Sequence, residues 1–112
     1  MIGILLVAHG PDQGQTFQLA EGEALLIGRG LDSGTRLKDP CVARSHCRLA
    51  CAEGKAILWD CGSKNGTWVN GKKVTQCELR PGDAIRVGDT QLWFRWADDE
   101  ELKSADPAQE EP

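Results

Sequence analysis

Turn-forming residue pairs recur along this sequence at short intervals, and they constrain its fold more than any other feature. The pairs are Gly10-Pro11, Glu53-Gly54, Asn65-Gly66, Asn70-Gly71, Pro81-Gly82 and Gly88-Asp89. Asn-Gly supplies the positive φ angles that tight hairpins require, and Gly and Pro interrupt helices. No segment between these pairs keeps helical periodicity over about 11 residues. The chain is therefore predicted to be built from short strands.

The segments between the turns are apolar or alternate between apolar and polar residues. In the last segment Leu92, Phe94 and Trp96 fall on one face of a strand, because side chains alternate along it. We predict strands over Ile2–Ala8, Thr16–Leu19, Glu23–Gly28, Arg48–Ala52, Lys55–Asp60, Thr67–Val69, Lys72–Val74, Ala84–Val87 and Thr90–Trp96. Many short strands at regular spacing indicate an all-β sandwich or barrel.

Length and composition suit one folded domain. The chain has 112 residues, of which 40% are hydrophobic and can form a core. No apolar run approaches the roughly 20 residues that a membrane helix needs, so we expect no membrane association. The apolar opening segment lacks a basic flank, which favours a first strand over a signal peptide.

Charge is distributed unevenly along the chain. The net charge is −4, but residues 98–112 hold seven acids and one lysine, so residues 1–97 carry +2. The end segment has two prolines and almost no large apolar side chains. We therefore predict a folded domain over residues 1–97 and a disordered acidic tail over residues 98–112. A body charge of only +2 beside this tail argues against nucleic-acid binding.

The five cysteines are odd in number, and no pair has a CxxC spacing. They are Cys41, Cys47, Cys51, Cys61 and Cys77. A secreted disulfide framework normally has an even count, so we expect a cytoplasmic protein with reduced thiols in or near the β core. The two histidines lack the spacing of metal ligands, and we expect neither a metal nor another cofactor.

Two segments are richer in polar chemistry than turning requires. The first runs from Gly28 to His46 and the second from Asp60 to Gly71. Together they offer three arginines, two lysines, asparagines, serines and glycines. Guanidinium groups grip phosphate oxygens as a charged fork, and backbone N–H groups beside glycine add further donors. This inventory indicates a phosphate-binding site.

Three motifs in these segments resemble, in order and spacing, those of the forkhead-associated (FHA) domain. They are Gly28-Arg29, the S-R-x-H-like run Ala43-Arg44-Ser45-His46, and Asn65-Gly66-Thr67 followed by Asn70-Gly71. The resemblance implies an FHA/SMAD-like sandwich of about eleven strands in two antiparallel sheets, with the recognition loops at one end. It also implies a protein interaction module that binds phosphothreonine peptides in Ser/Thr kinase signalling.

The resemblance implies roles for individual residues as well. Arg29 matches the arginine that contacts the phosphate, and Asn65 matches the asparagine that orients the peptide backbone. The predicted phosphopeptide-binding residues are Arg29, Arg44, Ser45, Lys64 and Asn65. The predicted structural support of the site comes from Gly28, His46, Gly66, Asn70 and Gly71. The expected partner is a phosphothreonine-containing protein, either a Ser/Thr kinase or its substrate, bound by a monomer.

Ala43 departs from the family pattern, which has serine at this position. The family serine hydroxyl donates to the phosphate, and a hydrogen bond to a charged group contributes about 1.5–3 kcal/mol. We therefore predict a retained but weakened phosphate site. Ser45 lies two residues further on and would compensate if the loop were turned toward the phosphate.

Other interpretations remain open at this stage. Arg29, Arg44 and Lys64 are also explained as ordinary solvated cations. A second hypothesis is a phosphate-independent adaptor, with Trp93 as an exposed contact and the other three tryptophans, Trp59, Trp68 and Trp96, mostly in the core.

An enzyme is not expected, because no arrangement of nucleophile and base is apparent. His46 and Cys47 are adjacent, so on a strand their side chains point to opposite faces and cannot form a dyad. The sequence also lacks a G-x-S-x-G motif and a Walker lysine.

Overall fold

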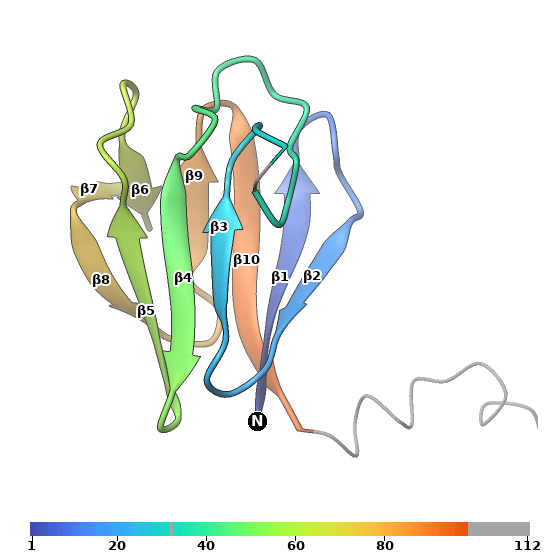
Figure 1. Ribbon diagram of the computed structural model, residues 1–112, viewed down its shortest axis with the longest axis vertical. Helices are drawn as coiled ribbons and strands as arrows, with labels where there is room; N and C mark the ends of the chain where they lie inside the picture. Colours follow the sequence, from blue (N-terminus) through green and yellow to red (C-terminus); the bar gives the residue numbers. More distant parts are fainter. Residues whose placement is uncertain (32, 99–112) are drawn as a thin grey trace, which may run out of the picture.

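The computed structural model describes residues 1–31 and 33–98, and these residues form ten strands (Figure 1). The strands are β1 (Ile2–His9), β2 (Thr16–Leu19), β3 (Ala24–Ile27), β4 (Cys47–Ala52), β5 (Lys55–Asp60), β6 (Thr67–Val69), β7 (Lys72–Val74), β8 (Gln76–Leu79), β9 (Ala84–Val87) and β10 (Thr90–Ala97). The described residues include no helix with the length and apolarity that crossing a bilayer would require.

The strands form two antiparallel sheets that pack face to face (Figure 1). The larger sheet has the order β2-β1-β10-β9-β6-β7, and the smaller has the order β3-β4-β5-β8. The N-terminus and the end of β10 lie at one end of the sandwich. The long connections from β3 to β4 and from β5 to β6 lie at the opposite end, which we call the loop end. Topology thus gathers residues 28–46 and 61–66 of the two polar segments at one end.

The core lies between the sheets and follows the alternation of the strands. Leu92 and Phe94 of β10 face inward, while Trp93 between them is 52% exposed. The largest fully buried side chains are Phe94, Leu5, Ile27, Leu37, Leu49, Leu58, Ile85, Leu92, His46, Val7, Val42 and Val87. Burying one such apolar side chain stabilises the fold by about 1.5–3 kcal/mol.

The all-β sandwich is confirmed, and the nine predicted strands lie within one residue of their observed bounds. The strand β8 was not predicted, because polar Gln76 and Glu78 interrupt its apolar pattern. The described residues hold ten strands rather than about eleven. Along the β3–β4 connection the Gly28 carbonyl accepts from the Leu37 N–H and from the Ser33 and Thr35 hydroxyls, and the described residues of this connection form no further strand.

The core prediction was wrong for two tryptophans. Trp96 packs on the core with its ring centroid 5.2 Å from that of Phe94, but Trp59 and Trp68 are half-buried on the outer faces of the sheets. Alternation defines two faces of a strand, and an aromatic side chain on the solvent face can still cover its neighbours.

The cysteines also divide into two groups. Cys47 and Cys51 are buried and Cys77 is half-buried, as expected, whereas Cys41 and Cys61 are exposed in the loops. All five thiols are free. Burial raises the pKa of Cys47 to about 12, so this thiol is inert at neutral pH.

Candidate functional site

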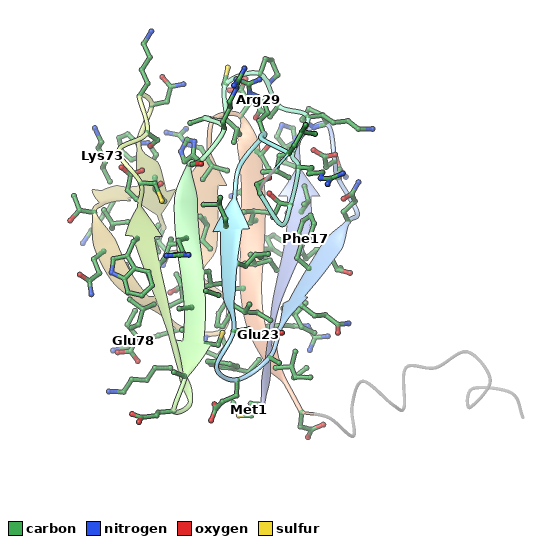
Figure 2. The ribbon with its side chains drawn as sticks, viewed as in Figure 1. Met1, Phe17, Glu23, Arg29, Lys73 and Glu78 are labelled. Carbon is green, nitrogen blue, oxygen red and sulfur yellow. The ribbon has the colours of Figure 1, made fainter. Side chains whose placement is uncertain are left out.

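Two loops meet at the loop end of the sandwich. The first loop, residues 28–46, joins β3 to β4, and the second loop, residues 61–66, joins β5 to β6. Figure 2 shows Arg29 at this end of the molecule, with Met1 at the other. The first loop enters β4 and the second loop leaves β5, and these two strands pair with each other. The polar residues of the two loops are thereby brought together.

The Arg29 side chain is held in place by the first loop itself. Its backbone N–H donates to the Ala43 carbonyl at 3.1 Å, and its Nε donates to the Val42 carbonyl at 2.7 Å. Val42 is only 1% exposed, so the guanidinium is tied to a residue anchored in the core. The terminal guanidinium nitrogens are left as donors at an exposed position.

Gly28 permits the close approach of the two halves of the first loop. A Cβ at this position would lie 2.0 Å from the Arg44 carbonyl oxygen, a distance that no side chain can occupy. The neighbouring Gly30 N–H donates to that same carbonyl at 3.1 Å. The predicted supporting role of Gly28 therefore has a steric explanation, since it lets Arg29 and Arg44 lie side by side.

His46 connects the two loops through both of its ring nitrogens. Its Nδ1 accepts from the Ala43 N–H at 3.0 Å, and its Nε2 lies 2.8 Å from the Gly66 carbonyl. Because a backbone N–H can only donate, Nδ1 is the acceptor and the proton is on Nε2. The ring is 0% exposed. His46 thus fixes the first loop to the second from within.

Asn65 makes a second connection between the loops. Its Nδ2 donates to the Cys41 carbonyl at 3.0 Å, and its own carbonyl accepts from the Trp68 indole N–H at 3.2 Å. The Arg86 guanidinium lies over the Trp68 ring, 5.1 Å from its centroid, and this cation–π contact also stabilises the indole. The amide oxygen of Asn65 stays available to a ligand.

Asp60 organises the second loop. Its carboxylate accepts from the backbone N–H groups of Gly62 and Ser63 and from the hydroxyl groups of Ser63 and Thr67. Partial burial raises the pKa of Asp60, but these hydrogen bonds outweigh it and hold the pKa below the ordinary value of 3.8. The charged form is therefore the one that shapes the loop.

A pH dependence follows from this shift. Since the pKa of Asp60 is lower in the folded state, its contribution is fully present above about pH 4 and is lost as the pH falls through the folded pKa. We expect Asp60→Asn to lower the free energy of unfolding at neutral pH and to flatten its decline between about pH 5 and about pH 3. Chemical denaturation across this range measures both. The exposed Glu78→Gln is the control, and equal pH profiles for the two variants would contradict the role of Asp60.

Arg29 separates two hollows at the loop end. The small hollow, of about 180 Å³, is lined by Arg29, Pro40, Cys41, Val42, Ala43, Lys64 and Asn65. The large hollow, of about 590 Å³, is lined by Arg29, Gly30, Leu31, Arg44 and Ser45. Within residues 1–31 and 33–98, no hydrogen bond or ion pair engages the side chain of Arg44 or Lys64. Each hollow therefore offers two cations to an anion.

The predicted site residues are distributed over this surface. Arg29, Lys64 and Asn65 share the small hollow, while Arg44 and Ser45 line the large one with Arg29. Ala43 faces the small hollow, so Ser45 and Ala43 line different hollows.

The predicted supporting residues fall into two places. Gly28, His46 and Gly66 lie within the two loops, as described above. Asn70, with φ 51°, and Gly71 form the β6–β7 turn instead. The Asn70 side chain bonds to Asp83 and Ala84, and it contacts neither loop through these bonds.

Several positioning residues were missed in the sequence. Asp39 is 1% exposed and accepts from the N–H groups of Cys41 and Asp89 and from the Thr90 hydroxyl, which ties the first loop to the β9–β10 turn. The buried Asp12 accepts from the Lys38 N–H at 2.8 Å. An aspartate beside a turn is a local signal for backbone bonding, such as that from Cys41 to Asp39. The partners Asp89, Thr90 and Lys38, however, lie far away in the sequence from the aspartates that they contact.

Asp39, Cys41 and Asp89 also bring three possible metal-ligand atoms within 4.8 Å of one another. Both oxygens of Asp39 already accept hydrogen bonds from the protein. A hydrogen bond to the Asp89 carboxylate and its charge raise the pKa of Cys41, which favours the thiol over the metal-binding thiolate. These contacts join the first loop to the β9–β10 turn.

Comparisons with known proteins give one matching family model and several FHA relatives. Residues 6–98 match the family model described as the inner membrane component of T3SS, cytoplasmic domain. The chain is 42% identical over 82 residues to the FHA domain-containing protein FhaA of Mycobacterium tuberculosis. It is 35% identical over 91 residues to the glycogen accumulation regulator GarA of Mycolicibacterium smegmatis. These alignments cover 73% and 81% of this chain but only 15% and 57% of the two relatives.

A solved structure supports the same assignment. It comes from an analysis of phosphothreonine-dependent FHA domain interactions, and it superimposes with a TM-score of 0.80 at 37% sequence identity. The superposition covers 88% of this chain and 99% of that chain.

Proposed function

We propose that this chain, which belongs to the forkhead-associated (FHA) domain family, binds phosphothreonine peptides as an interaction module in Ser/Thr kinase signalling. The observation that carries the proposal is the arrangement of Arg29, Lys64 and Asn65 around the small hollow. The partner would be a kinase or a kinase substrate, bound by a cytoplasmic monomer. The solved relative comes from work on phosphothreonine-dependent interactions, which supports the same ligand class.

The chemistry of the small hollow suits a phosphate joined to a peptide. Arg29 supplies a guanidinium already fixed by its Nε bond to Val42, so little side-chain freedom is lost on binding. Lys64 supplies a second charge, and the amide of Asn65 can hold the peptide backbone. A dianionic phosphothreonine gains from both cations, whereas a neutral threonine gains from neither.

The side chains that could act as a catalytic base or nucleophile are engaged or buried, which fits a binding role. Both ring nitrogens of His46 are engaged by backbone groups, so the imidazole has no lone pair or proton to offer a substrate. The adjacent Cys47 is buried with its pKa raised to about 12, which keeps it from acting as a nucleophile. We therefore propose a module without catalysis of its own.

Titration of the protein with a phosphothreonine peptide and its unphosphorylated twin tests the proposal. We expect binding of the phosphorylated peptide alone. Equal binding of both peptides would instead support a phosphate-independent adaptor of the same fold.

Ala43→Ser is expected to strengthen phosphopeptide binding. Ala43 lines the small hollow, and a hydroxyl there would donate to the phosphate. A hydrogen bond to a charged group contributes about 1.5–3 kcal/mol, which corresponds to a gain in affinity of about ten- to a hundredfold. Isothermal titration calorimetry measures the gain. Ala52→Ser, at an exposed position at the far end of β4, is the matched control. Equal affinities for the two variants would mean that residue 43 does not face the bound phosphate.

A further inference from the structure

The large hollow is chemically distinct from the small hollow beside it. The described residues that line it bring two guanidinium groups, from Arg29 and Arg44, together with the Ser45 hydroxyl, and none of these described residues is an acid. Its volume of about 590 Å³ compares with about 180 Å³ for the small hollow. The large hollow therefore has room for a whole side chain and carries donors suited to a negative group.

The backbone keeps this hollow open. Gly30 lines it without a side chain, and a Cβ at Gly30 would lie only 3.3 Å from the Cβ of Arg44. The Gly30 N–H donates to the Arg44 carbonyl, which holds the two sides of the hollow at a set separation. At the rim, Leu31 is 81% exposed and offers an apolar surface to the stem of an incoming side chain.

Arg29 joins the two hollows. Its Nε is engaged by the Val42 carbonyl, which leaves the two terminal nitrogens of a planar fork to face ligands. Of these two hollows, Lys64 and Asn65 line the small one, whereas Arg44 and Ser45 line the large one. A single phosphate in the small hollow would thus leave the Arg44 charge without a partner among the described residues that line the large hollow.

We infer that the large hollow is a second anion subsite, which takes a carboxylate or a second phosphate of the same peptide near its phosphothreonine. The inference rests on the proposed function and deepens it. The ligand class is then a peptide with two negative groups, of which Arg29 contacts both and Arg44 with Ser45 contacts only the second. An arginine fork binds carboxylate and phosphate alike, and a dianionic phosphate gains more than a carboxylate.

The test uses phosphothreonine peptides with neutral flanking residues as the reference. In further peptides one glutamate, or one second phosphothreonine, is moved through successive positions on either side. We expect one position at which glutamate raises the affinity about three- to tenfold over the reference and a second phosphate raises it further. An increase for the second phosphate alone would identify the ligand as a doubly phosphorylated peptide.

The ratio of these affinities is then measured in Arg44→Gln. In this variant the affinity for the doubly anionic peptide, divided by the affinity for the reference peptide, is expected to fall to about one. Arg48→Gln, an exposed arginine that lines neither hollow, should leave the ratio unchanged. Thermal unfolding confirms that both variants are folded.

The outcomes separate the inference from the function on which it rests. If the reference peptide binds no better than its unphosphorylated twin, the proposed function fails and the second subsite with it. If the reference binding depends on phosphate but no position raises the affinity, the subsite alone is refuted. An affinity ratio that stays unchanged in Arg44→Gln would also refute the second subsite.

Discussion

Arg29→Ala is expected to abolish phosphate-dependent binding. Arg29 lines both hollows, and its guanidinium is fixed by the Val42 carbonyl. Removing one partner of a hydrogen-bonded charge pair in an interface costs about 2–5 kcal/mol, or roughly a 30- to several thousandfold loss of affinity. Titration with a phosphothreonine peptide measures the loss.

Arg80→Ala is the matched control for this experiment. Arg80 is an exposed arginine of the β8–β9 turn and lines neither hollow. Arg80→Ala changes the net charge by the same amount as Arg29→Ala, so it measures any general electrostatic effect on binding. Similar losses in the two variants would mean that net charge, rather than the site, governs binding.

His46→Ala is expected to have the largest effect on stability. The substitution leaves the Ala43 N–H and the buried Gly66 carbonyl without their partners and opens a cavity at a fully buried position. An unsatisfied buried group costs about 1–3 kcal/mol, so we expect a loss of about 3 kcal/mol or more in the free energy of unfolding. Chemical denaturation measures this loss, and phosphopeptide affinity should fall with it because the two loops are no longer joined.

His9→Ala provides the comparison, because His9 is the other histidine of the chain and lies exposed at the end of β1. It should change the free energy of unfolding by less than about 0.5 kcal/mol. If the two variants are equally stable, the ring of His46 does not connect the loops.

Much of the fold was predictable because local chemistry determines it. Asn70 with positive φ beside Gly71, and Gly88 at the last hairpin, turn the chain where the residue pairs indicated. The strands between them follow from alternation. The strand β8 escaped prediction because its polar residues face solvent at the edge of the small sheet.

The interior of the first loop was not predictable in the same way. Its shape depends on bonds between residues distant in the sequence, such as Lys38 to Asp12 and Asp89 to Asp39. No local sequence pattern identifies such distant hydrogen-bond partners. The motifs identified Arg29, Arg44 and Lys64 as neighbours, but only the folded loop shows that Arg29 divides them between two hollows.

Backbone amide chemical shifts test the central claim most directly. Isotope-labelled protein is titrated with a phosphothreonine peptide and, separately, with its unphosphorylated twin. The account predicts shifts at residues 28–30, 41–45 and 63–66 with the phosphorylated peptide only, because these residues surround the two hollows. Equal shifts with both peptides, or shifts centred on the outer face around Trp93, would contradict it.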